Sequence, residues 1–128
     1  AALDWLAKEF SKRHDIQCVF ASSADAIEMQ DSQRTAMFRI AQEALTNIVK
    51  HASATEVRIE LFEDSEGVNM EITDNGKGAS EEAIARGNRF GIRGMRERAA
   101  NLGGWLEVSG AANNGMSVML FLPKKSNR

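Results

Sequence analysis

Apolar residues recur along the chain with two periods, and these periods predict its helices and strands. Apolar residues at helical spacing predict three helices, over residues 2–14, 31–52 and 92–102. Alternation or a short apolar run predicts five strands, over residues 16–21, 57–61, 68–72, 105–108 and 116–122. Asp31 or Ser32 is expected to cap the long helix, and the turn at 64–67 is expected to join two strands into an antiparallel hairpin.

The order of these elements predicts the fold class. Helices and hairpin strands mix without regular βαβ alternation, which favours an α+β fold, a two-layer α/β sandwich. Pro123 ends the last strand, so we expect one domain over residues 1–123 and a flexible tail over 124–128. The first helix begins without a leading segment, as it would in a fragment of a longer protein.

Composition narrows the classes of partner. A formal net charge of -2 gives no overall attraction to nucleic acid or to an anionic membrane. No apolar run approaches the about 18 residues of a membrane span, and no signal peptide is evident. Cys18 is the single cysteine, which excludes an intramolecular disulfide and favours a reducing compartment. We therefore expect a cytoplasmic domain without membrane contact, whether or not its parent protein is anchored in a membrane.

Polar residues of the long helix lie beside its apolar stripe. At about 100° per residue they share one face at the edge of the core, and they are Glu43, Asn47, Lys50 and His51. An amide oxygen of Asn47 suits magnesium, which keeps several waters. Glu43 could orient a metal-bound water or take a proton, while Lys50 and His51 could neutralise phosphate oxygens. A solvated helix face with a Glu-to-Lys pair explains the same residues.

A glycine-spaced turn follows the second strand of the hairpin. In the sequence Asp74-Asn75-Gly76-Lys77-Gly78, the two glycines allow the backbone to approach a ligand closely. A carboxylate at a strand end needs a hydrogen-bond donor, and an adenine amino group would suit Asp74. An ordinary Asp-Asn-Gly turn is the alternative. The long segment 76–90 that follows favours a functional loop.

A second glycine pair stands at the start of the last helix, Gly91-Ile92-Arg93-Gly94-Met95. A helix N-terminus with glycines offers free N–H groups to phosphate. Between residues 77 and 98 six basic residues face three acidic ones, a local charge of +3 in an acidic chain. The Arg-rich start could also be a solvated face, which is the favoured interpretation for Arg96 and Arg98.

Taken in order, these motifs resemble the N, G1 and G2 boxes of the ATP-binding domain of sensor histidine kinases, most closely the NarX-like subfamily of the GHKL superfamily. The resemblance implies a Bergerat fold, a mixed, mostly antiparallel sheet covered on one face by about three helices. It implies ATP and Mg²⁺ as cofactors, with Asn47 as the magnesium ligand, Asp74 at the adenine and Glu43 as the catalytic carboxylate of the N box. The remaining residues it assigns to ATP are Lys50, His51, Gly76, Gly78, Gly91, Ile92, Arg93, Gly94 and Met95.

The chain departs from the family pattern at two places. The last box usually reads Gly-Thr, but here it reads Gly115-Met116, and Ser117 faces the other side of its strand. We expect altered hydration near the base. The phosphoacceptor histidine of the family stands on a separate helical domain, and His14 ends the first helix in a setting typical of solvent exposure.

The resemblance therefore implies a protein-histidine kinase catalytic domain, a transferase in a phosphorelay. Its partners would be the dimerisation and phosphoacceptor domain of the same parent and a response regulator downstream. By itself the chain is expected to bind ATP without phosphorylating itself. Two alternatives remain open: a stand-alone GHKL ATPase or serine kinase, and a non-catalytic nucleotide-sensing module.

Overall fold

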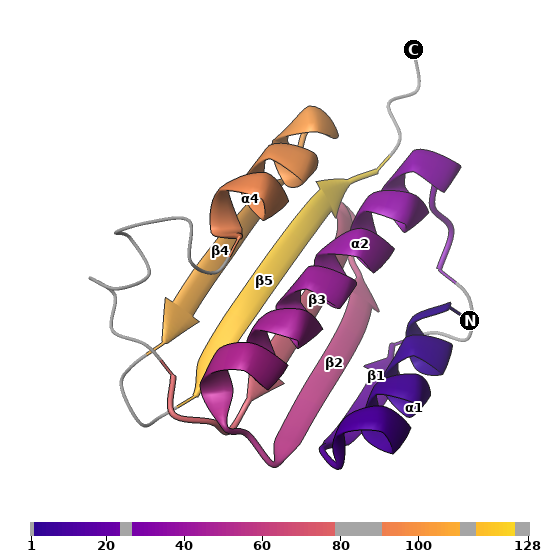
Figure 1. The fold of residues 1–128 in the computed structure, drawn as a ribbon. Coiled ribbons are helices and arrows are strands. Elements are labelled where there is room, and N and C mark those ends of the chain that lie inside the picture. The colour runs from indigo at the N-terminus through magenta and orange to yellow at the C-terminus, as the bar shows by residue number, and fades with distance from the viewer. Residues whose placement is uncertain (1, 24–26, 79–90, 111–114, 125–128) are drawn as a thin grey trace.

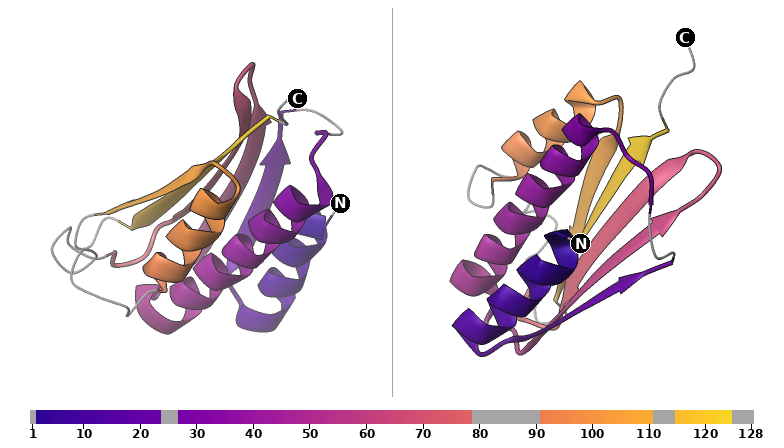
Figure 2. Two further views of the ribbon diagram at one scale, coloured as in Figure 1. Left: turned by 90° about the horizontal axis from the view of Figure 1, so that it is seen from above. Right: turned by 90° about the vertical axis from the view of Figure 1, so that its right-hand side faces the viewer.

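In the part of the chain that the structure describes, a five-stranded sheet carries three α-helices on one face and none on the other (Figures 1 and 2). This computed structural model describes residues 2–23, 27–78, 91–110 and 115–124. Its helices are α1 (Ala2–His14), α2 (Asp31–Asn47) and α4 (Ile92–Asn101), and a π-helical turn η1 (Ile48–Ala52) continues α2. Its strands are β1 (Gln17–Ser22), β2 (Glu56–Glu63), β3 (Gly67–Asp74), β4 (Trp105–Gly110) and β5 (Met116–Pro123). The predicted α/β sandwich is confirmed.

The strand order is β1-β2-β3-β5-β4. Strands β1 and β2 are parallel, and the other three pairs are antiparallel, as expected for a mixed, mostly antiparallel sheet. The predicted hairpin is β2–β3, and Asp74 at its end lies between Val57 on one side and Met116 on the other. This register places the start of β2 beside the turn that follows Asp74.

Alternation along the strands sends one set of side chains under the helices. Ile59, Met70 and Leu120 from three neighbouring strands are fully buried, and Met37 and Ile40 of α2 pack onto the same core. Burial of each such side chain contributes about 1.5–3 kcal/mol, which explains why the periodicity of the sequence predicts these elements. Among the described residues, no helix is long and apolar enough to cross a membrane.

The start of α2 differs from the prediction. Gln30, not Asp31 or Ser32, is the N-cap residue, and its backbone N–H donates to Oε1 of Gln33 (3.0 Å). Gln33 is buried and donates through Nε2 to the carbonyl oxygen of Pro123 (2.8 Å). Its side chain therefore serves the cap and also ties α2 to the end of β5.

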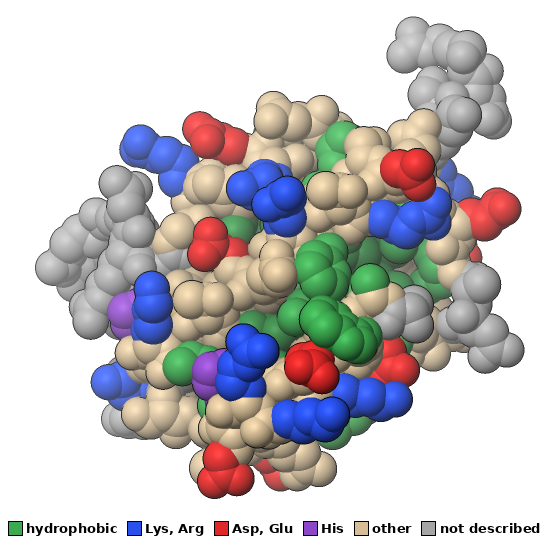
Figure 3. All heavy atoms as spheres, turned by 45° about the vertical axis from the view of Figure 1, so that its right-hand side comes forward, with side chains coloured by type: hydrophobic (Ala, Val, Ile, Leu, Met, Phe, Trp, Pro, Cys, Tyr) green, Lys and Arg blue, Asp and Glu red, His purple; other side chains and the backbone are tan. Residues whose placement is uncertain are grey.

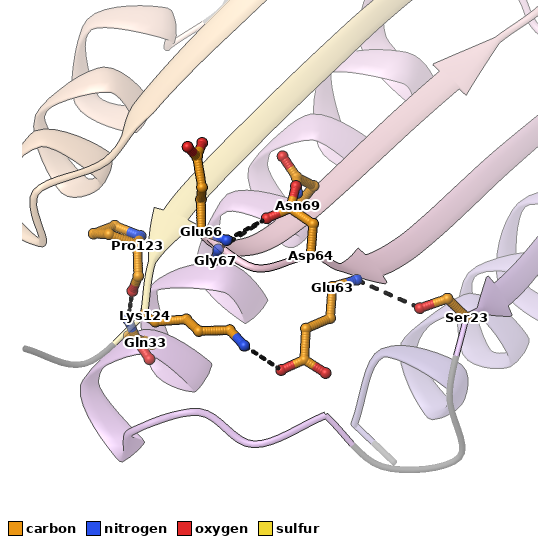
Figure 4. A network of polar contacts seen from close by, with 9 residues as sticks. All are labelled: Ser23, Gln33, Glu63, Asp64, Glu66, Gly67, Asn69, Pro123 and Lys124. Carbon is orange, nitrogen blue, oxygen red and sulfur yellow. Dashed lines mark hydrogen bonds and ion pairs between the residues drawn. The ribbon is translucent and has the colours of Figure 1, made fainter.

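The sheet end farthest from Asp74 is held by a polar network (Figure 4). Oδ1 of Asp64 accepts the backbone N–H of Glu66 (2.8 Å) and of Gly67 (3.0 Å), and Oδ2 accepts Nδ2 of Asn69 (3.3 Å). These donors hold the pKa of Asp64 below its ordinary value. The backbone N–H of Lys124 donates to Glu66 (3.0 Å), so the chain is still tied to the hairpin just after β5.

The helix-covered side bears a hollow of about 320 Å³ between α1 and the end of α2. Its lining includes Trp5, Phe10 and Val49, and the side chain of Trp5 is 57% exposed. Hydrophobic side chains gather on this side among Lys, Arg, Asp and Glu side chains (Figure 3). Trp105 is 49% exposed and stacks on Phe121 with 5.7 Å between ring centroids, so neither tryptophan lies in the core.

Candidate nucleotide site

The four polar residues predicted on one helix face are divided by the π-turn. Glu43 and Asn47 lie in the last turns of α2, whereas Lys50 and His51 lie in η1, where the winding is wider. Lys50 lines the hollow beside α1, in the company of Trp5. The helix does not keep its α-helical period past Asn47, so Lys50 is turned toward α1 relative to Glu43, and its assignment to ATP stays a prediction.

Glu43 lies on the opposite side of α2, beside the start of α4. A β-carbon added to Gly91 would stand 3.5 Å from Cδ of Glu43 and 3.6 Å from its Oε1. Gly91 adopts φ of +64°, a left-handed conformation that glycine accepts without strain. The structure thus brings together the first and the third motif of the sequence.

Within α4 the motif divides into a buried and an exposed half. Ile92 and Met95 are 3% and 2% exposed and pack in the hydrophobic core, so any contact of this segment with phosphate would come from its backbone or from its exposed residues. Arg93 and Gly94 are exposed, as are Arg96 and Arg98. The backbone N–H of Met95 donates to the carbonyl oxygen of Gly91 (3.2 Å), so the helix itself uses this donor.

Steric crowding within the described part of the chain does not explain why residue 94 is a glycine. A β-carbon at this position would have no neighbouring atom within 4 Å. Glycine inside a helix is less stable than alanine by about 0.5–1 kcal/mol. A bare backbone at the exposed start of α4 suits the close approach of a ligand.

Asp74 is a half-buried carboxylate at the end of β3. Its Oδ1 accepts the backbone N–H of Gly76 (2.8 Å). Burial raises the pKa of Asp74 above its ordinary value, and backbone N–H groups of Gly76 and Met116 offset part of this rise. Ionised carboxylates offer about four acceptor positions, so the group keeps capacity for a donor from a ligand.

The turn after Asp74 is fixed by a residue that sequence reasoning did not select. Oδ1 of Asn75 accepts the backbone N–H of Thr55 (2.9 Å) and of Glu56 (3.0 Å), and Nδ2 donates to Oγ1 of Thr55 (2.9 Å). Gly76 is buried, and Gly78 has φ of +65°. Most of the predicted loop, residues 79–90, lies outside the described residues.

The Gly115-Met116 motif lies at the start of β5, beside Asp74. A side chain on Gly115 would overlap the carbonyl oxygen of Asp74, and its φ of +77° also favours glycine. Met116 is half-buried and packs against the core. Oγ of Ser117 donates to Oε2 of Glu71 (3.1 Å). The hydroxyl of Ser117 therefore bonds to Glu71. This contact agrees with the expectation that Ser117 does not replace the threonine hydroxyl of the family motif.

These elements converge at one end of the sheet. The segment that leaves η1 leads directly into β2, whose start is bonded to the turn after Asp74. The carboxyl group of Glu43 lies near Gly91, 3.5 Å from the position that a β-carbon on Gly91 would take. The structure thus assembles a carboxylate on a turn, a polar helix end and a glycine-started helix, while it places Lys50 toward α1.

Comparisons with known proteins agree on the kind of domain. Residues 32–126 match the family described as histidine kinase-, DNA gyrase B- and HSP90-like ATPases. The sensor histidine kinase MctS of Rhizobium johnstonii is 30% identical over the whole chain, which covers 28% of that protein. The histidine-protein kinase/phosphatase UhpB of Salmonella typhimurium is 39% identical over 79% of the chain, which covers 19% of its length. The chain spans less than a third of either relative.

Solved structures share the fold. The catalytic domain of histidine kinase ThkA superposes with a TM-score of 0.77 at 16% identity, over 94% of this chain and 86% of that one. The histidine kinase domain of the blue-light-activated kinase of Erythrobacter litoralis EL346 gives 0.71 at 20% identity, over 94% and 58%. The sequence resemblance to sensor histidine kinases is confirmed at the level of the family and the fold.

Proposed function

Because the chain belongs to the family of histidine kinase-, DNA gyrase B- and HSP90-like ATPases, we propose that it is the Mg-ATP-binding catalytic domain of a two-component sensor histidine kinase. Residues 1–123 form this domain in the proposal. It supplies the γ-phosphoryl group to a histidine on a separate dimerisation domain of the same parent. A response regulator acts downstream of that parent, whose cytoplasmic portion includes this domain.

One observation carries the proposal. The side chain of Glu43 lies against Gly91, and the helix that bears Glu43 ends at the strand to which the Asp74 turn is bonded. Three motifs that are far apart in the sequence thus lie at one end of the sheet. This convergence suits a ligand with a base at one end and phosphates at the other.

The base end fits adenine. Asp74 is half-buried, and the donors that it accepts are backbone N–H groups. An exocyclic amino group is a neutral donor that a half-buried carboxylate can accept without a charged partner. Gly115 keeps the space beside Asp74 clear of a side chain. We assign Asp74 to the adenine amino group, and Gly76 and Gly78 to the turn that lets the backbone approach it.

The phosphate end fits magnesium through few protein groups. Asn47 is half-buried at the last position of α2 and offers an amide oxygen, a ligand of the hard type that magnesium takes. Bound magnesium would neutralise phosphate charge and orient the transferred group. Glu43 orients water or takes a proton beside Asn47, and His51 lies one turn further. The first turn of α4 contributes exposed backbone at Gly94 and the cation of Arg93.

Phosphoryl transfer in trans tests the function. The chain is mixed with γ-labelled ATP, magnesium and a separately purified helical domain that carries the phosphoacceptor histidine of the parent. Labelled, acid-labile phosphohistidine on the added domain is expected, and Glu43→Gln should reduce it. Steady ATP hydrolysis without transfer would instead support a stand-alone ATPase. Binding without either reaction would support a nucleotide-sensing module.

A further inference from the structure

Asn75 uses its whole side chain, and its backbone N–H, on the start of β2. The side-chain bonds to Thr55 and Glu56 measure 2.9–3.0 Å, and the backbone N–H of Asn75 donates to the carbonyl oxygen of Glu56 (3.2 Å). These partners are 19 or 20 residues away in the sequence. Ordinary Asx turns bond a residue two positions further on, so this amide performs a different task.

The orientation of the amide follows from its partners. Backbone N–H groups can only donate, so the carbonyl side of Asn75 must face Thr55 and Glu56. The NH₂ side then meets Oγ1 of Thr55, which can accept. Since each bond has a single consistent direction, the clamp is specific for a side chain with an acceptor at this position.

Thr55 joins three segments at this point. It bonds to Asn75 through both its N–H and its hydroxyl, and its carbonyl oxygen accepts the backbone N–H of Gln17 (3.0 Å) at the start of β1. It also stands just after η1, separated from it by Ser53, which has φ of 52°, and by buried Ala54. The end of the α2–η1 helix is therefore tied within a few residues to the Asp74 turn.

We propose that Asn75 is a positioning residue of the nucleotide site, which fixes the Asp74 carboxylate relative to the end of the α2–η1 helix. The inference rests on the proposed function and adds a residue to it. The backbone N–H of Gly76, the next residue, donates to Oδ1 of Asp74. When Asn75 is anchored, the peptide that carries this donor is anchored too, and the carboxylate keeps its orientation and its burial.

Two variants separate the clamp from a general role in folding. Asn75→Ala removes all three side-chain bonds, whereas Asn75→Asp keeps acceptors for Thr55 and Glu56. Asn101→Ala, an exposed asparagine at the end of α4, is the control. Titration calorimetry with Mg-ADP should show about tenfold weaker binding for Asn75→Ala, the effect expected when an ordering contact is lost. Asn75→Asp should stay close to the unaltered chain.

The second readout needs no nucleotide. Carboxyl carbon NMR follows the titration of Asp74 in the unliganded chain and in Asn75→Ala. In the variant the turn opens to water, and relief of burial outweighs the loss of the Gly76 donor because burial is the larger cause of the shift. The pKa of Asp74 should therefore fall toward its ordinary value. An unchanged Asp74 titration would overturn the proposal, as would equal loss of affinity in Asn75→Ala and Asn75→Asp. If the unaltered chain bound no nucleotide, the proposed function would fail, while the titration would still decide whether Asn75 positions Asp74.

Discussion

The carboxyl group of Glu43 lies beside Gly91, with 3.5 Å between its Cδ and the position that a β-carbon of Gly91 would take. This proximity links the last turns of α2 to the residue just before α4. A β-carbon on Gly91 would lie at ordinary van der Waals distance from Glu43, but any side chain there would strain a left-handed backbone. The backbone conformation at the start of α4 therefore favours glycine.

Gly94 is expected to lower the stability of the unliganded domain and to favour the binding of Mg-ATP. Gly94→Ala is expected to stabilise the unliganded domain by about 0.5–1 kcal/mol, because the β-carbon meets no described atom and helix propensity improves. Mg-ATP affinity should fall, because the exposed backbone at the start of α4 becomes covered. Urea unfolding and calorimetry measure the two effects.

Gly103→Ala provides the matched control at the other end of α4. Its φ of +79° makes alanine unfavourable by about 1–2 kcal/mol, and its position after the helix is away from the site. This variant should lose stability and keep its affinity for ATP. Equal affinities in the unaltered chain and in Gly94→Ala would remove Gly94 from the site.

Asp74 is expected to contribute to adenine binding and to lower the stability of the folded chain at neutral pH. Asp74→Asn is expected to weaken ATP binding by about 10- to 100-fold, the value of a hydrogen bond to a charged group. The folded-state pKa of Asp74 is raised, so the folded chain holds its proton longer than the unfolded chain does. Stability should therefore fall as pH rises from the ordinary aspartate pKa through the folded-state pKa, and Asp74→Asn should lack this fall. Unchanged ATP affinity would disprove the adenine assignment.

Asn47 should act through the metal. Asn47→Ala is expected to weaken Mg-ATP binding by about tenfold or more, while adenosine, which has no phosphate to chelate magnesium, should bind as before. Calorimetry with and without magnesium separates the two ligands. Equal loss for ATP and adenosine would count against the metal role and indicate a local change in α2.

Asp64 should make the distal hairpin pH-sensitive. Its folded-state pKa is lowered by backbone donors from Glu66 and Gly67, so its charge stabilises the folded chain above the ordinary aspartate pKa. This contribution is lost as pH falls through the folded-state pKa. Asp64→Asn should lower the midpoint of thermal unfolding at neutral pH, and the difference should vanish in acid. Nucleotide affinity should be unaffected, because Asp64 lies at the far end of β3 from Asp74.

The helices and strands could be predicted because the spacing of apolar residues in the sequence reflects which side chains are buried. Val57 and Ile59 of β2 alternate with less buried neighbours, and Met37 and Ile40 repeat at helical spacing. The N-cap at Gln30 could not be predicted, because glutamine is not a preferred N-cap residue. The cap also depends on Gln33, whose side chain bonds both to Gln30 and to Pro123 of the distant β5.

The site was predicted in its motifs and missed in its details. The spacing and the residue types predicted Glu43, Asp74 and Gly91 as members of the site. The π-turn between Glu43 and Lys50 could not be predicted, because it does not change the pattern of apolar residues along the helix. The sequence also did not show that Met95 is buried in the core with its backbone N–H bonded to Gly91. Asn75 was missed because its partners lie on another strand, and its only local signal is its place between Asp74 and Gly76.

The π-turn at Ile48–Ala52 has one further consequence. Its bonds run from residue i to i+5, so the turn holds about one residue more than an α-helix would need. Deletion of a single residue there would restore α-helical winding and leave the direction of the chain beyond it nearly unchanged, so Thr55 could still reach Asn75. Deletion of one residue within the regular part of α2 would instead rotate everything beyond it by about 100° and separate Thr55 from Asn75. The π-turn is therefore the part of this helix where the loss of one residue should do the least harm.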